Sequence, residues 1–135
     1  MVFVLEGVVT NVIKYSGLNF GSFQVSPQGF FGALLLSFAT AISEETVFRG
    51  YIFNRLLKIW KKEWLANLVS SALFSFIHLP IAVFGLGYTP VVMLVYLFLV
   101  LIYSIGAAFV FARTENIISS ILLHVLWSWP VILFK

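Results

Sequence analysis

The chain carries Ser43-Glu44-Glu45-Thr46-Val47-Phe48-Arg49-Gly50, which places three charged side chains inside an otherwise apolar segment. Apolar residues flank it on both sides, at 29–36 and 51–53. A charge at bilayer depth costs at least about 2.5–3.5 kcal/mol, so such residues usually have partners and a function. The only two histidines, His78 and His124, also lie in apolar runs. We therefore expect these residues to meet in one buried polar site.

The composition is that of a helical membrane protein. Of the 135 residues, 61% are hydrophobic and 10% are charged, whereas soluble domains carry about 25% charged residues. The absence of cysteine excludes disulfides, thiolate metal ligands and a cysteine nucleophile. The net charge of +3 comes mostly from a cluster between predicted helices. It therefore indicates membrane topology and not nucleic-acid binding.

The sequence predicts an all-α, polytopic transmembrane helical bundle with about four spans plus a short N-terminal helix. Residues 1–28 are predicted to form a short N-terminal hydrophobic segment and a loop, and residues 29–135 a single membrane domain. Pro27 suits the first turn of a helix. Residues 81–89 contain two glycines and no charge, and we expect a loop there. The predicted long helices cover residues 27–58, 64–79, 90–111 and 117–134.

Basic residues predict the orientation of a multi-pass protein in the cell membrane. Lys14 and Lys135 are the only basic residues predicted for one side. The other side holds the two connections near residues 58–64 and 113–116, which we expect to face the cytoplasm. The basic residues in or beside these connections are Arg55, Lys58, Lys61, Lys62 and Arg113.

Helical geometry assigns different roles to the two adjacent glutamates. Glu45 and Arg49 are spaced i,i+4, so they can pair on one helix face. Glu44 points about 100° away from that face, so its side chain can face the predicted polar site. A desolvated glutamate suits a general base that acts on water.

Helical rise gives approximate depths for the histidines. Glu44 and His78 each lie fourteen residues from the first connection, roughly 21 Å into the membrane. His124 lies eight residues from the second connection, roughly 12 Å deep and nearer the level of Arg49. A histidine there can orient water, bind a metal or donate to an oxyanion. Ser128 follows His124 by one turn and can also donate a hydrogen bond.

Three motifs in this order and spacing resemble the CPBP family of intramembrane proteases, over about residues 29–129. This family includes CAAX prenyl endopeptidases of the Rce type and bacterial bacteriocin-processing or self-immunity proteins. The resemblance implies a peptide or protein substrate, either a prenylated C-terminus or a leader-type peptide, and contact with membrane lipid but not with nucleic acid. The motifs are Glu44-Glu45-x-x-x-Arg49, Phe74-x-x-x-His78 and His124-x-x-x-Ser128.

The resemblance also implies roles. Glu44 would activate the attacking water with His78 as its partner, and Glu45 and Arg49 would support them. His124 and the residue at 128 would stabilise the oxyanion. The family usually has asparagine where this chain has Ser128. A hydroxyl is shorter and gives one donor, and loss of an oxyanion donor can cost about 10²–10³ in rate.

A divalent metal such as zinc is an alternative to a metal-free mechanism. Glu44, His78 and His124 could supply three ligands, with water as the fourth, as in catalytic zinc sites. However, the chain has no His-Glu-x-x-His motif, and if Glu44 binds the metal, Glu45 must act as the base. We favour the metal-free mechanism.

Other interpretations give these residues no catalytic role. Glu45 and Arg49 can be a structural ion pair, and each histidine can bond a backbone carbonyl. A non-catalytic membrane protein of the same fold could bind a toxin or partner, as an immunity protein does, and Ser128 favours this alternative. A third class is an ion or proton pathway lined by the same side chains.

Overall fold

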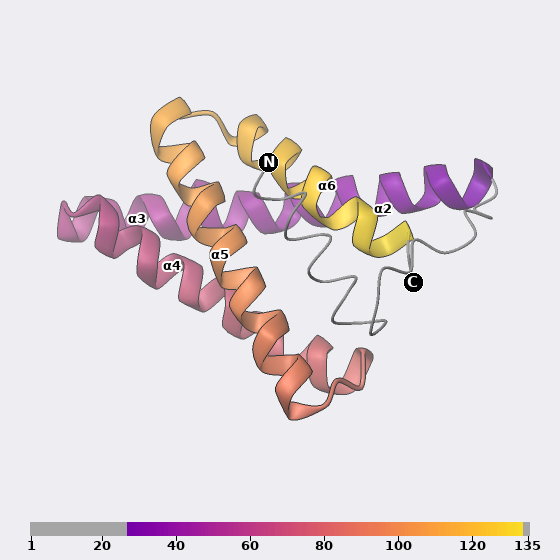
Figure 1. The fold of residues 1–135 in the computed structure, drawn as a ribbon. Coiled ribbons are helices and arrows are strands. Elements are labelled where there is room, and N and C mark those ends of the chain that lie inside the picture. Colours follow the sequence, from indigo (N-terminus) through magenta and orange to yellow (C-terminus); the bar gives the residue numbers. More distant parts are fainter. Residues whose placement is uncertain (1–26, 134–135) are drawn as a thin grey trace. The chain divides into compact units, whose positions relative to one another are not determined.

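The computed structural model describes residues 27–133, which are helical apart from short connections (Figure 1). No strand occurs in this range, and the all-α fold class is confirmed. The predicted N-terminal helix lies outside the described residues. The elements, with η denoting π-helices, are α2 (Pro27–Glu45), η1 (Thr46–Phe53), α3 (Asn54–Trp60), α4 (Glu63–Ile77), η2 (Ile81–Gly85), α5 (Pro90–Thr114) and α6 (Ile117–Leu133).

Three helical stretches are long and apolar enough to cross a membrane: Gln28–Trp60, Glu63–Gly85 and Pro90–Thr114. A span needs about 20 residues, and these stretches have 33, 23 and 25. The fourth predicted span contains a shorter apolar helix, Ile117–Ser128. The protein is therefore an integral membrane protein built from helices.

The chain divides into two compact units, which we describe separately. The core unit consists of Glu45–Ser120. The terminal unit consists of residues 1–44 and 121–135, of which 27–44 and 121–133 are described. The boundary falls between Glu44 and Glu45, so the two adjacent glutamates belong to different units.

Within the core unit, α4 packs along α5 (Figure 1). Ala66 and Ala108 are buried in one cluster with Phe53 and Phe111, whose ring centres lie 5.9 Å apart. Small residues let membrane helices approach closely, and side-chain hydrogen bonds then join them. The Ser75 hydroxyl donates to the Leu97 carbonyl at 2.8 Å. The same two helices are also joined by Asn67 Nδ2, which donates to the Ile105 carbonyl at 3.1 Å.

The first long helix starts at Pro27, as predicted, but it is not a continuous α-helix. Residues Thr46–Phe53 wind as a π-helix, in which backbone bonds run from i to i+5. At the return to α-helix, the Asn54 N–H bonds Tyr51 O, and the Asn54 side chain donates to Gly50 O at 3.0 Å. A side chain thus satisfies a carbonyl where the backbone pattern changes. Wider winding begins directly after Glu45.

The predicted loop over residues 81–89 is wrong in its first half. Residues Ile81–Gly85 form the π-helix η2, because an apolar segment without charge can continue winding past Pro80. The turn comes at Gly87, whose φ of 61° suits glycine. The Tyr88 N–H then bonds Ala82 O at 3.0 Å, and α5 starts at Pro90 as predicted.

Candidate active site

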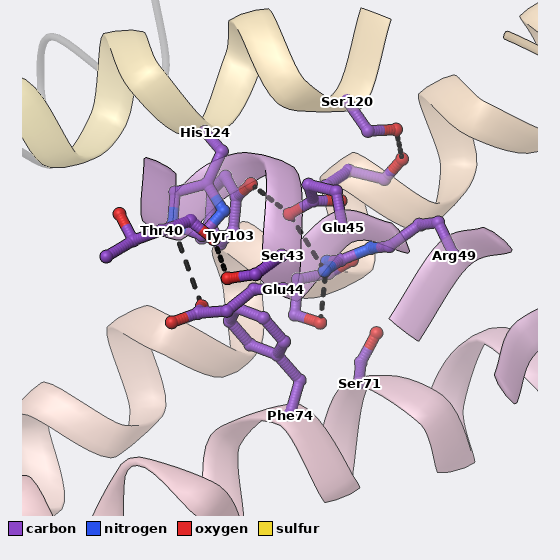
Figure 2. Close-up of polar contacts among 12 residues, drawn as sticks. Thr40, Ser43, Glu44, Glu45, Arg49, Ser71, Phe74, Tyr103, Ser120 and His124 are labelled. Atoms are coloured by element: carbon purple, nitrogen blue, oxygen red, sulfur yellow. Dashed lines mark hydrogen bonds and ion pairs between the residues drawn. The ribbon is translucent and has the colours of Figure 1, made fainter. Parts of the chain in front are cut away.

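Glu45 and Arg49 form a buried ion pair in the core unit (Figure 2). Arg49 Nη1 lies 3.0 Å from Glu45 Oε1, and the side chains are 2% and 0% exposed. The i,i+4 pairing predicted from the sequence is confirmed. A buried pair is stable only when further hydrogen bonds satisfy its remaining atoms, because both ions lose their hydration.

Helix α5 supplies further hydrogen bonds to Glu45 Oε1 and to Arg49 Nη2. The Tyr103 hydroxyl donates to Glu45 Oε1 at 2.9 Å. Arg49 Nη2 donates to the Ser104 carbonyl at 3.0 Å and to the Ser104 hydroxyl at 2.9 Å. Tyr103 and Ser104 were not among the predicted site residues, because residues 90–111 have the pattern of a plain apolar span. The available signal was two adjacent hydroxyl side chains in that span.

Aromatic rings cover the Arg49 guanidinium. Its central carbon lies 4.6 Å from the centre of the Phe74 ring and 5.7 Å from that of Tyr103. A desolvated cation over an aromatic face gains electrostatic energy from the ring quadrupole. Phe74 is fully buried and also packs edge-on against Phe48, with ring centres 5.0 Å apart. Phe74 therefore contacts both Arg49 and the aromatic interior.

His78 caps the end of α4 and is half-buried. Its Nδ1 lies 2.8 Å from the carbonyl oxygen of Phe74, and its ring lies 4.7 Å from the Phe74 ring. A carbonyl oxygen only accepts hydrogen bonds, so Nδ1 carries the proton. In the neutral ring, Nε2 then carries the lone pair and can accept a proton or a hydrogen bond. The Tyr96 ring lies 6.3 Å away.

Glu44 and His124 lie together in the terminal unit. His124 Nε2 is 3.9 Å from Glu44 Oε2, and the side chains are 4% and 28% exposed. This separation exceeds a direct hydrogen bond. The depth estimate had set His124 shallower than Glu44. It failed because rise along a helix axis gives depth only when the helix is not tilted.

Ser128 follows His124 by one turn of α6. Its hydroxyl oxygen is buried and has no hydrogen-bond partner within residues 27–133. Serines in helices readily bond their own backbone, so this hydroxyl is an exception. It retains a donor that an incoming group could use.

Two of the three candidate metal ligands, Glu44 and His124, belong to the terminal unit, and the third, His78, belongs to the core unit. Within the described part of the chain, no cluster of three or more His, Asp or Glu side chains could hold a metal ion. Glu44 and His124 are close together in the terminal unit, but catalytic zinc sites use three protein ligands.

Comparison with known families gives one match that spans most of the chain. A family model described as type II CAAX prenyl endopeptidase, Rce1-like, matches residues 26–130. The match includes all six of the predicted site residues. The curated proteins and the solved structures give no match.

The buried ion pair and an exposed one can be compared directly. We expect Arg49→Leu to lower the free energy of unfolding by about 3–5 kcal/mol, because it leaves the Glu45 charge buried without its cation. Arg113 pairs with Glu63 at 2.7 Å, but its side chain is 57% exposed. Arg113→Leu should therefore cost about 1 kcal/mol or less. Unfolding of both variants in a mild detergent checks this, and equal losses would contradict the burial argument.

Proposed function

Because the chain belongs to the Rce1-like family of type II CAAX prenyl endopeptidases, a protease family, we propose that it is an intramembrane endopeptidase that uses glutamate-activated water. The observation that carries this proposal is the pair of Glu44 and His124, with Oε2 and Nε2 separated by 3.9 Å. This pair places a carboxylate that can act as a base on water beside an imidazole that can donate to the oxyanion.

Glu44 is the better candidate for the base than its neighbour Glu45. The Glu44 side chain is 28% exposed, although its Oε2, the oxygen nearest to His124, is buried. Glu45 is fully buried, and its Oε1 already accepts hydrogen bonds from Arg49 and Tyr103. We therefore assign proton abstraction to Glu44. Glu45 and Arg49 have a supporting role.

We assign to His78 the role of orienting the attacking water. The bond from Nδ1 to the Phe74 carbonyl fixes the ring and leaves the lone pair on Nε2. That nitrogen can accept a hydrogen bond from a water molecule. In the proposed step, Glu44 takes a proton from the water as the water oxygen attacks the carbonyl carbon of the substrate peptide bond. Glu44 then gives this proton to the amide nitrogen as the C–N bond breaks.

His124 and Ser128 are assigned to the developing oxyanion. They lie one turn apart on α6, and each can provide a donor. The buried Ser128 hydroxyl has no hydrogen-bond partner in the described residues, so it is available to a substrate oxygen. Donors that are already in place when negative charge develops stabilise the transition state most.

The proposed substrate is a peptide segment at the membrane, either a prenylated C-terminus or a leader-type peptide. It would enter laterally from lipid or from the cytoplasmic face. Five of the eight basic residues of the chain lie in or beside the α3–α4 and α5–α6 connections. We place these connections in the cytoplasm, because Lys and Arg predominate in cytoplasmic loops. With both connections on the cytoplasmic side, the helices between them must cross the membrane more than once.

One observation favours a second function. Ser128 stands where the resemblance leads us to expect asparagine, and a weakened oxyanion site suits a family member that binds a peptide or toxin without cleaving it efficiently. Such a protein would act as a membrane binding or immunity protein. Cleavage measurements separate the two functions.

We expect Glu44→Gln to abolish cleavage of a membrane-tethered peptide reporter, because an amide cannot accept the proton of the attacking water. Thr46→Ala, two residues away on the exposed side of η1, should cleave like the wild type. The assay follows product formation in proteoliposomes, with prenylated, unprenylated and leader-type reporters compared. Cleavage by Glu44→Gln at the wild-type rate would disprove the proposed mechanism.

We expect Ser128→Asn to raise kcat, because an amide reaches further than a hydroxyl and adds a donor. A complete oxyanion donor is worth about 10²–10³ in rate, which is the upper limit of the gain. Initial rates at saturating reporter measure the effect. An unchanged kcat would show that residue 128 does not limit oxyanion stabilisation.

A further inference from the structure

Tyr103 and Ser104 are buried polar residues of α5 that take no part in the proposed steps. Their contacts run to Glu45 and Arg49. We propose that Tyr103 is a positioning residue, whose hydroxyl holds Glu45 and Arg49 so that Glu44 and His78 keep their orientations. This inference rests on the proposed function of those two groups.

The first connection leads from Tyr103 to Glu44 through the backbone. Glu45 is the last residue of α2 and follows Glu44 directly. Its Oε1 accepts hydrogen bonds from Tyr103 at 2.9 Å and from Arg49 at 3.0 Å (Figure 2). Two donors on one oxygen fix Glu45 at the point where α-helical winding changes to π-helical winding. The peptide unit that carries Glu44 is therefore held from its C-terminal side.

The second connection leads from Tyr103 to His78 through Arg49 and Phe74. The guanidinium that pairs with Glu45 lies 4.6 Å from the Phe74 ring centre. The Phe74 carbonyl accepts the Nδ1–H of His78 at 2.8 Å. If Arg49 moves, Phe74 loses the cation packed on its ring, and the carbonyl that orients His78 can shift with it. One hydroxyl therefore supports both proposed catalytic groups.

Tyr103→Phe isolates the hydroxyl, because it leaves the ring in place 6.0 Å from the Phe74 ring. We expect kcat to fall about tenfold or more, as for other outer hydrogen-bond partners of a site, with KM changed by less than about twofold. Tyr51→Phe is the matched control. It removes the same atom from a side chain of η1 that is 61% exposed, and its kcat should equal that of the wild type.

A double-mutant cycle tests whether Tyr103 acts through Glu45. We expect Tyr103→Phe combined with Glu45→Gln to lower kcat no further than the more severe single variant, because both changes break the same connection. Multiplied effects would overturn the proposal, since they would show independent roles. Ser104→Ala is a second variant that keeps the carbonyl bond to Arg49, and it should lower kcat about threefold with KM unchanged.

Glu44→Gln, measured in the same proteoliposomes, distinguishes a failure of the positioning role from a failure of the proposed function. If Glu44→Gln is inactive and Tyr103→Phe cleaves at the wild-type rate, the positioning role is wrong and the proposed function stands. If Glu44→Gln cleaves normally, the proposed function is wrong, and the positioning role is overturned with it. The thermal midpoint of each variant is also recorded. A loss of kcat in Tyr103→Phe that only follows a loss of folded protein would overturn the proposal as well.

Discussion

The packing of the core unit depends on one fully buried ion pair. Glu45 and Arg49 lie where α2 meets η1, with almost no exposure. Removing two ions from water is costly unless their atoms are satisfied by good hydrogen bonds. Tyr103 and Ser104 provide hydrogen bonds to the pair and the Phe74 ring packs on the guanidinium, so two further helices contact it. Packing of α4 and α5 in the core unit is therefore tied to the position of this pair.

Two adjacent carboxylates of the same type have different environments and, in our account, different functions. Glu45 contacts the Arg49 guanidinium and the Tyr103 hydroxyl, and this environment suits a structural role. The other, Glu44, has a partly exposed side chain and an imidazole 3.9 Å from one oxygen, and in our proposal it is the base. Pairs of titratable groups in contrasting surroundings commonly divide structural and chemical roles in this way. The family of proteases to which the chain belongs is consistent with a hydrolytic role for the second.

Much of this arrangement could be predicted from sequence, and the failures have physical causes. The Glu45–Arg49 pair was predictable because i,i+4 spacing is local. Tyr103 was not, because its contact with Glu45 joins residues 58 positions apart. The π-helical winding after Glu45 leaves no mark on an apolar sequence pattern, and helical rise alone could not place His124 beside Glu44. The assignment of residues 1–28 as a separate N-terminal segment is still a prediction.

The most direct test of the central claim compares the thermal midpoints of Glu44→Gln and Glu45→Gln, measured side by side in one detergent. The two substitutions are isosteric and adjacent, so they differ only in surroundings. Our account predicts a midpoint near that of the wild type for Glu44→Gln and a clearly lower one for Glu45→Gln, which loses the charge that neutralises Arg49. Equal losses, or a greater loss for Glu44→Gln, would contradict the division of roles between the two glutamates.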